Sequence, residues 1–81
     1  MMGKFKIIIE DLSGKMIQEI EMSEMIEGEV MDNDIIEKYL IPIITQLQNG
    51  IEYIVKIRRI ANNDFIIAKS IRRKGDTMVF T

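Results

Sequence analysis

Apolar and polar residues alternate along two stretches near the start of the chain, residues 4–10 and 15–22. Successive side chains of a β-strand point to opposite faces, so this alternation predicts two half-buried strands. Residues 11–14 separate them, and Gly14 can adopt the left-handed conformation that closes a four-residue loop. We therefore predict an antiparallel hairpin with one apolar face and one charged face.

Charge complementarity predicts the register of this hairpin. Three oppositely charged pairs form if Glu10 faces Lys15, Lys6 faces Glu19 and Lys4 faces Glu21, with Ile8 opposite Ile17. Apart from Gln18, the other face is apolar and gathers Phe5, Ile7, Ile9, Met16, Ile20 and Met22. A slip of one residue would exchange the two faces, so we expect the apolar face to pack in the core.

An amphipathic helix is predicted over residues 34–47, after an irregular acidic connection at residues 23–31. Asp34 followed by Glu37 resembles a capping box, and Asn49-Gly50 supplies a stop signal. Helical spacing relates Ile36, Leu40, Ile43, Ile44 and Leu47. Proline removes a backbone donor and clashes with the preceding turn, so Pro42 predicts a kink or break near Ile41.

Residues 51–60 and 65–72 predict a second hairpin, with Asn62 and Asn63 at the central turn positions, where positive φ is needed. In a regular ladder Ile60 faces Phe65, and the next rungs pair Arg59 with Ile66, Arg58 with Ile67 and Ile57 with Ala68. This register places Tyr53, Val55, Ile57, Ile66 and Ala68 on the face under the helix. Residues 77–81 alternate after a Lys74-Gly75 turn, which predicts one further strand.

The predicted fold is a single small α+β domain of residues 1–81, with the order ββαβββ, or ββαββ if the last segment is not a strand. It has one largely antiparallel sheet of four or five strands, with a single kinked helix packed on one face. The order of the strands beyond the two hairpins does not follow from the sequence.

Composition removes several kinds of chemistry. The 81 residues include no cysteine and no histidine, so thiol catalysis, disulfides, imidazole acid–base chemistry and ordinary zinc ligand sets are excluded. No uncharged stretch approaches the ~20 apolar residues of a membrane span, and no secretion signal is apparent. We therefore expect a cytoplasmic protein with no membrane association, no cofactor, no metal and no small-molecule substrate, and no enzymatic activity.

Charge is divided unevenly along the chain. Residues 1–48 hold ten acids and four bases, whereas residues 49–81 hold three acids and seven bases. In the predicted hairpin the bases form a stripe on the outer face, with Lys56 directly opposite Lys69. The candidate anion or nucleic-acid contacts are Lys56, Arg58, Lys69, Arg72, Arg73 and Lys74. The simpler interpretation is that Glu10, Glu19 and Glu21 of the first hairpin neutralise these bases, because aromatic stacking platforms are scarce and the pI is about 5.1.

Apolar residues on the same predicted outer face suggest a different function. The helix can cover only one face of the sheet, so a group of exposed isoleucines opposite it would mark a partner contact. The candidate interface residues are Ile54, Phe65, Ile67 and Ile71. We therefore predict a non-catalytic interaction module, accessory or inhibitory, that forms a homodimer or binds a protein partner. A nucleic-acid- or anion-binding domain is the alternative, and a register error of one residue in the second hairpin would redistribute these candidates.

Overall fold

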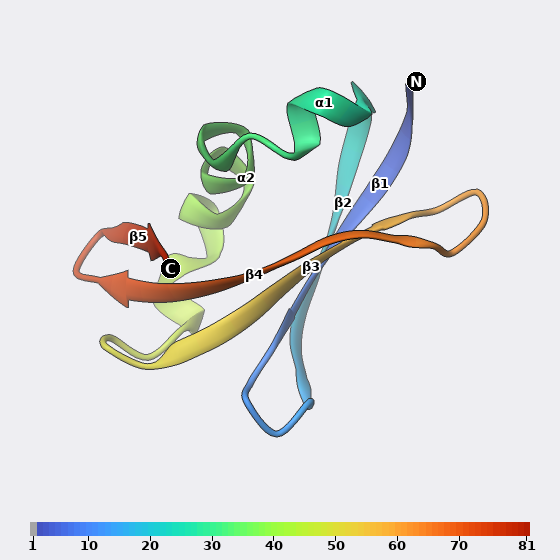
Figure 1. The fold of residues 1–81 in the computed structure, drawn as a ribbon. Helices are drawn as coiled ribbons and strands as arrows, with labels where there is room; N and C mark the ends of the chain where they lie inside the picture. Colours follow the sequence, from blue (N-terminus) through green and yellow to red (C-terminus); the bar gives the residue numbers. More distant parts are fainter. Residues whose placement is uncertain (1) are drawn as a thin grey trace.

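The computed structural model describes residues 2–81, which form five β-strands and a helical connection (Figure 1). The strands are β1 (Met2–Glu10), β2 (Met16–Ile26), β3 (Glu52–Arg59), β4 (Phe65–Lys74) and β5 (Thr77–Phe80). Between β2 and β3 lie α1 (Glu27–Val30), α2 (Asn33–Leu40) and the 3₁₀ helix η1 (Ile41–Gln46). The predicted α+β class and the order ββαβββ are confirmed, and the last segment does form a fifth strand.

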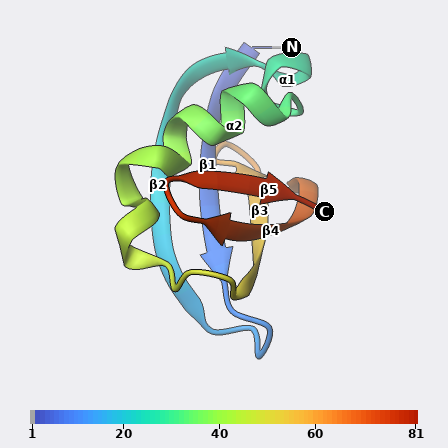
Figure 2. The same ribbon diagram turned by 90° about the vertical axis from the view of Figure 1, so that its left-hand side faces the viewer.

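All five strands belong to one antiparallel sheet in the order β2-β1-β3-β4-β5. The two hairpins join through β1 and β3, and their strands cross in projection because the sheet is strongly twisted (Figure 1). The sheet also curls around the helical segments (Figure 2). We call the face that packs against α2 and η1 the core face and the opposite one the outer face.

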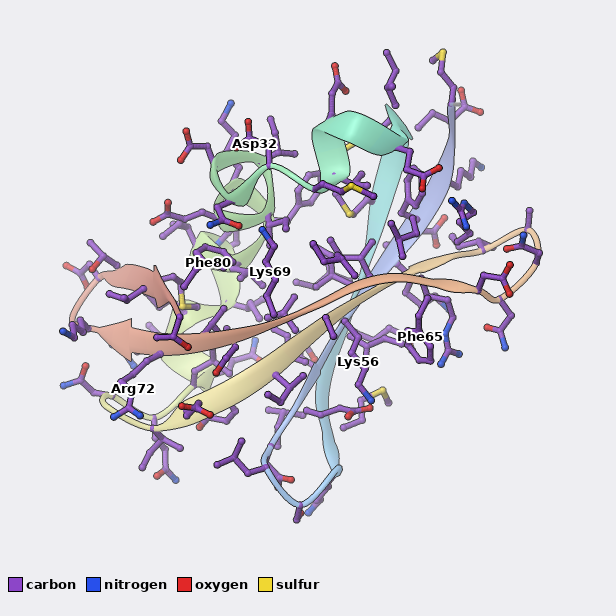
Figure 3. All side chains as sticks on the ribbon, in the orientation of Figure 1. Asp32, Lys56, Phe65, Lys69, Arg72 and Phe80 are labelled. Carbon is purple, nitrogen blue, oxygen red and sulfur yellow. The ribbon has the colours of Figure 1, made fainter. Side chains whose placement is uncertain are left out.

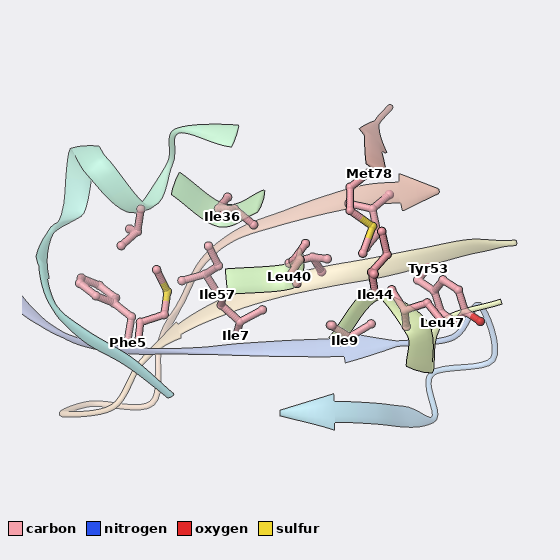
Figure 4. Packing of buried hydrophobic residues seen from close by; sticks show 14 residues of the cluster. Phe5, Ile7, Ile9, Ile36, Leu40, Ile44, Leu47, Tyr53, Ile57 and Met78 are labelled. Carbon is pink, nitrogen blue, oxygen red and sulfur yellow. The ribbon is translucent and has the colours of Figure 1, made fainter. Parts of the chain in front are cut away.

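The hydrophobic core lies between the core face and the helical segments (Figure 4). Its fully buried members include Phe5, Ile7, Ile9, Ile36, Leu40, Leu47, Val55 and Ile57. Each such large side chain contributes about 1.5–3 kcal/mol by leaving water. Tyr53 lies at the margin of the core, where its hydroxyl oxygen accepts a hydrogen bond from the Gln48 backbone N–H at 2.9 Å.

The β1–β2 hairpin keeps most of the predicted faces but not the predicted register. Lys6 faces Glu21 rather than Glu19, so the strands are offset by two residues from the predicted pairing. Such an offset keeps the side chains from Glu19 to Met22 on their predicted faces, and Phe5, Ile7 and Ile9 are buried as expected. The predicted place of Met16 on the apolar face is wrong, because Met16 pairs with Glu10 and is 54% exposed.

The offset of this hairpin has two sources. At the loop the Asp11 N–H donates to the Lys15 carbonyl, so Glu10 faces Met16 instead of Lys15, and a β-bulge between Ile9 and Glu10 adds the second residue.

The helical connection begins earlier than predicted. β2 continues to Ile26, and α1 forms a single turn where an irregular acidic connection was expected. The N-cap of α2 is Asp32, whose carboxylate accepts from the Asp34 backbone N–H at 2.8 Å, so the predicted capping box at Asp34 is wrong. The break near Ile41 is confirmed, because α2 ends at Leu40 and Pro42 lies in the first turn of η1.

The β3–β4 hairpin differs from the prediction by one rung. Ile57 pairs with Ile67 instead of Ala68, whereas Arg58 pairs with Phe65, which leaves Ile66 as an extra residue in β4. This irregularity is a β-bulge, and it exchanges the faces of β4 relative to the prediction. A bulge of this kind cannot be derived from alternation alone, which assumes one residue per rung.

The turn of this hairpin confirms one of the two predicted asparagine conformations. Asn63 has a φ of 61°, whereas Asn62 is not among the residues with positive φ. The Asn63 N–H donates to the Arg59 carbonyl at 2.9 Å, and the Arg59 N–H donates to the Asp64 carbonyl at 2.8 Å.

None of the helices within residues 2–81 has the length and apolar character needed to span a bilayer.

Candidate interaction surface

One row of side chains crosses four strands on the outer face. Glu21 of β2 pairs with Lys6 of β1, Lys6 pairs with Arg58 of β3, and Arg58 pairs with Phe65 of β4. Neighbouring residues along β1 and β3 belong to the core, so strand alternation directs this row away from the helices. We call these four residues the outer row.

Ion pairs cover most of the outer face beside this row. Lys6 Nζ lies 3.1 Å from Glu19 Oε1, and Lys56 Nζ lies 2.9 Å from Glu10 Oε1. Between them Ile8 is only 6% exposed although it lies on the outer face. The apolar stems of long charged side chains cover such positions while their charged ends stay in water. The outer face is therefore mainly a charged surface with apolar contacts beneath it.

Phe65 is the large apolar side chain of the outer row that remains open to solvent. It is 51% exposed, and the Arg58 guanidinium carbon lies 4.2 Å from its ring centroid, with Lys56 Nζ at 5.3 Å. Arg58 Nη1 also donates to Asn63 Oδ1 at 2.8 Å. Figure 3 shows Phe65 and Lys56 on the side of β3 and β4 away from α2. Two cations therefore restrain an exposed aromatic ring.

The predicted apolar interface is only half present on this surface. Ile54 and Phe65 lie on the outer face, but Ile67 and Ile71 face the core, and Ile71 is completely buried. The placement of Ile67 and Ile71 on the outer face was wrong because the bulge at Ile66 turns the following residues of β4 over.

The predicted basic stripe is divided between the two faces of the sheet. Lys56 faces Ala68 across the hairpin, while Lys69 faces Val55, so the predicted opposition of Lys56 and Lys69 is wrong. Lys69 Nζ donates to the Met31 carbonyl at 3.1 Å and to Asn33 Oδ1, toward α2 (Figure 3).

Most bases of that stripe already have partners within the chain. Glu10 neutralises Lys56, as the simpler interpretation of the sequence predicted, and Glu52 Oε1 lies 3.4 Å from Arg72 Nη2. Arg73 Nη1 donates to the Leu47 carbonyl at 2.8 Å, on the helical side of the sheet. Among residues 2–81, Arg58 and Lys74 are the two members of the stripe whose side chains bond neither a carboxylate nor a backbone carbonyl.

Sequence reasoning missed two members of the outer row as candidate contacts, Glu21 and Lys6. Both were assigned to the charged face of the first hairpin, but nothing in the sequence placed β1 beside β3. The adjacency of Lys6 and Arg58 depends on that strand order. The signal in the sequence was limited to the alternation of charged and apolar residues along β1 and β2, which indicates the face of Lys6 and Glu21 but not their neighbour on β3.

No pocket is found over residues 2–81, and the same residues contain no group of three or more potential metal ligands. The pKa of Asp11, which lies in the β1–β2 loop and outside the outer row, is lowered from its ordinary value. A hydrogen bond from the Ser13 hydroxyl is the main cause that lowers the pKa of this carboxyl, followed by the Lys15 backbone N–H.

Comparisons with protein-family models, curated proteins and solved structures find no match to this chain.

Proposed function

We propose that this chain is a non-catalytic protein-interaction module, accessory or inhibitory to its partner, that binds through the outer face of the sheet. The observation that carries the proposal is the exposed ring of Phe65, restrained by Arg58 at 4.2 Å. Aromatic residues and arginine are enriched at protein interfaces and among the residues that supply most binding free energy.

The surroundings of Phe65 support this role. A restrained ring loses little conformational entropy on binding, so more of its burial is available as affinity. Half-buried Ile54 lies two residues from Lys56 on the same face and extends the apolar contact. The ion pairs of Lys6 and Lys56 form a polar surround of the kind that excludes water from an interface centre.

The proposal leaves two protein partners, a second copy of the chain and a different protein. The cytoplasm is the expected location, since the chain contains no cysteine and needs no oxidising compartment for disulfides. The lack of cysteine also makes a selective experiment possible, because one introduced cysteine can carry a photo-crosslinker.

Ala68 is the position for that probe, because it is exposed on the outer face opposite Lys56. The Ala68→Cys variant carries a benzophenone and is irradiated alone and in extract of the source cells. We expect a crosslinked protein product that disappears when Phe65→Ala is added. Lys38→Cys, exposed on α2, is the matched control and should give no such product. Equal products from both positions, or none from Ala68→Cys in either sample, would overturn the proposal.

Nucleic-acid or anion binding is the second candidate. Arg58 favours it, because its guanidinium has no carboxylate partner among residues 2–81 and lies over an exposed aromatic ring. The evidence against nucleic-acid or anion binding is that four of the bases already have partners within the chain: Lys56, Lys69, Arg72 and Arg73. Few cations are therefore free to contact phosphates.

Fluorescence anisotropy with a short mixed-sequence oligonucleotide separates the two candidates. The interaction module predicts no binding at about 0.15 M salt, where exposed charges are screened beyond roughly 8 Å. Binding that weakens steeply with salt and with Arg58→Ala or Lys74→Ala would instead establish the second candidate.

A further inference from the structure

Two of the three charged residues of the outer row have no ionic partner among residues 2–81. Among residues 2–81, neither exposed Glu21 nor half-buried Arg58 takes part in a salt bridge. Lys6 lies between them, but its ammonium is held by Glu19 at 3.1 Å. Lys6 is therefore neutralised, whereas Glu21 on the β2 side of it remains acidic and Arg58 on the β3 side remains basic.

We infer that the outer face binds a second copy of this chain, in a two-fold dimer where Arg58 of each copy contacts Glu21 of the other. The inference rests on the proposed function and names the partner of the same surface. In a two-fold interface each contact occurs twice with the roles exchanged. A row with an unpaired acid on β2 and an unpaired base on β3 meets that requirement when the copies pack face to face, with the two-fold axis over Lys6, whose charge Glu19 neutralises.

The charges around the outer row are distributed in the same direction as those of the row, with acids on β2 and mainly bases on β3 and β4. On the outer face, β2 contributes the acids Glu19 and Glu21 and no base, whereas β3 and β4 contribute more bases than acids: Lys56, Arg58, Arg72 and Lys74 against Glu52. Packing the β2 side of one copy over the β3–β4 side of the other matches these halves in both directions. Complementary potentials of this kind favour one docking orientation and oppose others.

Phe65 occupies the place where such a contact would need an apolar anchor. It lies one strand beyond Arg58, about 4.8 Å further across the sheet. When Arg58 reaches Glu21 of the second copy, the ring therefore meets the free edge of β2, the outermost strand of that sheet. The ring then packs beside this free edge, which requires no complementary pocket.

The size of the surface sets the strength of the dimer. The sheet curls toward the helices (Figure 2), so only the central rows can meet a second copy. When Arg58 lies over Glu21 of the second copy, three strands of each copy overlap, and three strands about 4.8 Å apart with three rows about 6.6 Å apart offer roughly 300 Å² per copy. This area is below that of stable interfaces, so the dimer forms at high protein concentration and weakens with salt.

Charge reversal tests the reciprocal contact. Sedimentation equilibrium is measured up to about 1 mM protein, in low and moderate salt, on the full chain and on the single variants Arg58→Glu and Glu21→Arg. Each variant alone places like charges at both contacts, and we expect dimerisation about tenfold weaker or more. An equimolar mixture of the two variants restores opposite charges at both contacts, so the mixture should form heterodimers with near wild-type affinity.

Two control variants carry the same reversals outside the row. Glu24→Arg lies on β2 and Lys38→Glu on α2, both at exposed positions, and neither should change the wild-type dimerisation. The Arg58→Glu chain lacks the contact between Arg58 and the Phe65 ring, and mixing it with the Glu21→Arg chain does not give that contact back. Recovery in the mixture therefore comes from the opposite charges at the two contacts between the chains. Circular dichroism confirms that each variant is folded before its mass is interpreted.

The possible results are distinct. Weaker dimerisation of each single variant, together with recovery of dimerisation in their mixture, establishes the dimer. A wild-type chain that stays monomeric throughout the range overturns it, as does a dimer insensitive to both reversals or one that the mixture fails to restore. The proposed function fails separately, when the Ala68→Cys probe crosslinks no protein that depends on Phe65. A Phe65-dependent product that appears only in cell extract retains the module and replaces the second copy with another protein.

Discussion

Lys69 Nζ donates a hydrogen bond to the Met31 carbonyl oxygen at 3.1 Å, so β4 is tied to the junction between α1 and α2. A second bond to Asn33 Oδ1 extends this contact into the first turn of α2. The side chain thereby connects two parts of the chain that are 38 residues apart in the sequence. A base that the sequence suggested as an anion contact has a structural role here.

Lys69→Met keeps most of the side-chain length and removes both hydrogen bonds. We expect the free energy of unfolding to fall by about 1 kcal/mol, since water can replace part of what the exposed Met31 carbonyl loses. Urea denaturation followed by circular dichroism measures the change. Lys74→Met is the control at an exposed position and should alter stability by less than about 0.5 kcal/mol. Equal effects of the two variants would contradict the proposed link to the helices.

Ile71 and Phe65 were both candidates for the interface, but truncating them should lower the free energy of unfolding by very different amounts. Ile71 is completely buried, so Ile71→Ala should lower the free energy of unfolding by about 2–5 kcal/mol. Phe65→Ala removes an exposed ring and its cation contacts, which are worth only about 0.5–1 kcal/mol. Urea denaturation of both variants decides the point. A Phe65→Ala variant as unstable as Ile71→Ala would mean that the ring is part of the core.

The accuracy of the sequence prediction followed from how strongly each pattern constrains the chain. Alternation around Ile7 fixed the faces of the first hairpin, because exchanging them would bury charges and expose isoleucines. Pro42 located the break in the helix, since its missing N–H and its ring act locally. An offset of two residues in the same hairpin preserves the faces of Glu19 to Met22, so charge matching alone could not set the register, and no local signal marked the bulge that moved Met16 to the other face.

The site was less accessible to sequence reasoning because it depends on non-local pairing. The bulge at Ile66 decided which face Lys69 and Ile71 occupy, and no local signal marks it. The outer row depends on β1 lying beside β3, which is a choice among several sheet orders. Phe65 was identified as a contact candidate because its outward position sits at the turn, before the bulge changes the alternation.

Asp32 and Asp34 offer a direct test of where α2 begins. Asp32 accepts a hydrogen bond from the Asp34 backbone N–H at 2.8 Å, so Asp32→Ala leaves that donor without its cap. We expect a loss of about 1 kcal/mol in the free energy of unfolding. Asp34→Ala removes only a favourable charge near the helix start, which is worth about 0.3–1 kcal/mol. A larger loss from Asp34→Ala than from Asp32→Ala, measured by urea denaturation, would restore the capping box predicted from the sequence.

Asp11 makes the stability of the β1–β2 loop depend on pH. Its carboxylate accepts from the Ser13 hydroxyl at 2.6 Å and from the Lys15 backbone N–H at 3.0 Å. These bonds favour the charged form, and the pKa of Asp11 lies below its ordinary value of 3.8. A group whose pKa is lowered by folding stabilises the folded state above its unfolded pKa. That contribution is lost as the pH falls through the lowered folded pKa.

Ser13→Ala therefore tests the main cause of this shift. Removing the hydroxyl should raise the pKa of Asp11 toward 3.8, as measured by NMR titration of the side-chain carboxyl carbon. Asp11→Asn keeps an acceptor oxygen without the charge, so its unfolding free energy should lie below that of the wild type at pH 7. The difference should shrink as the pH falls below about 4, because the wild-type carboxyl then takes up a proton. A stability difference that stays constant between pH 7 and pH 2.5 would show that the charge of Asp11 does not stabilise the loop.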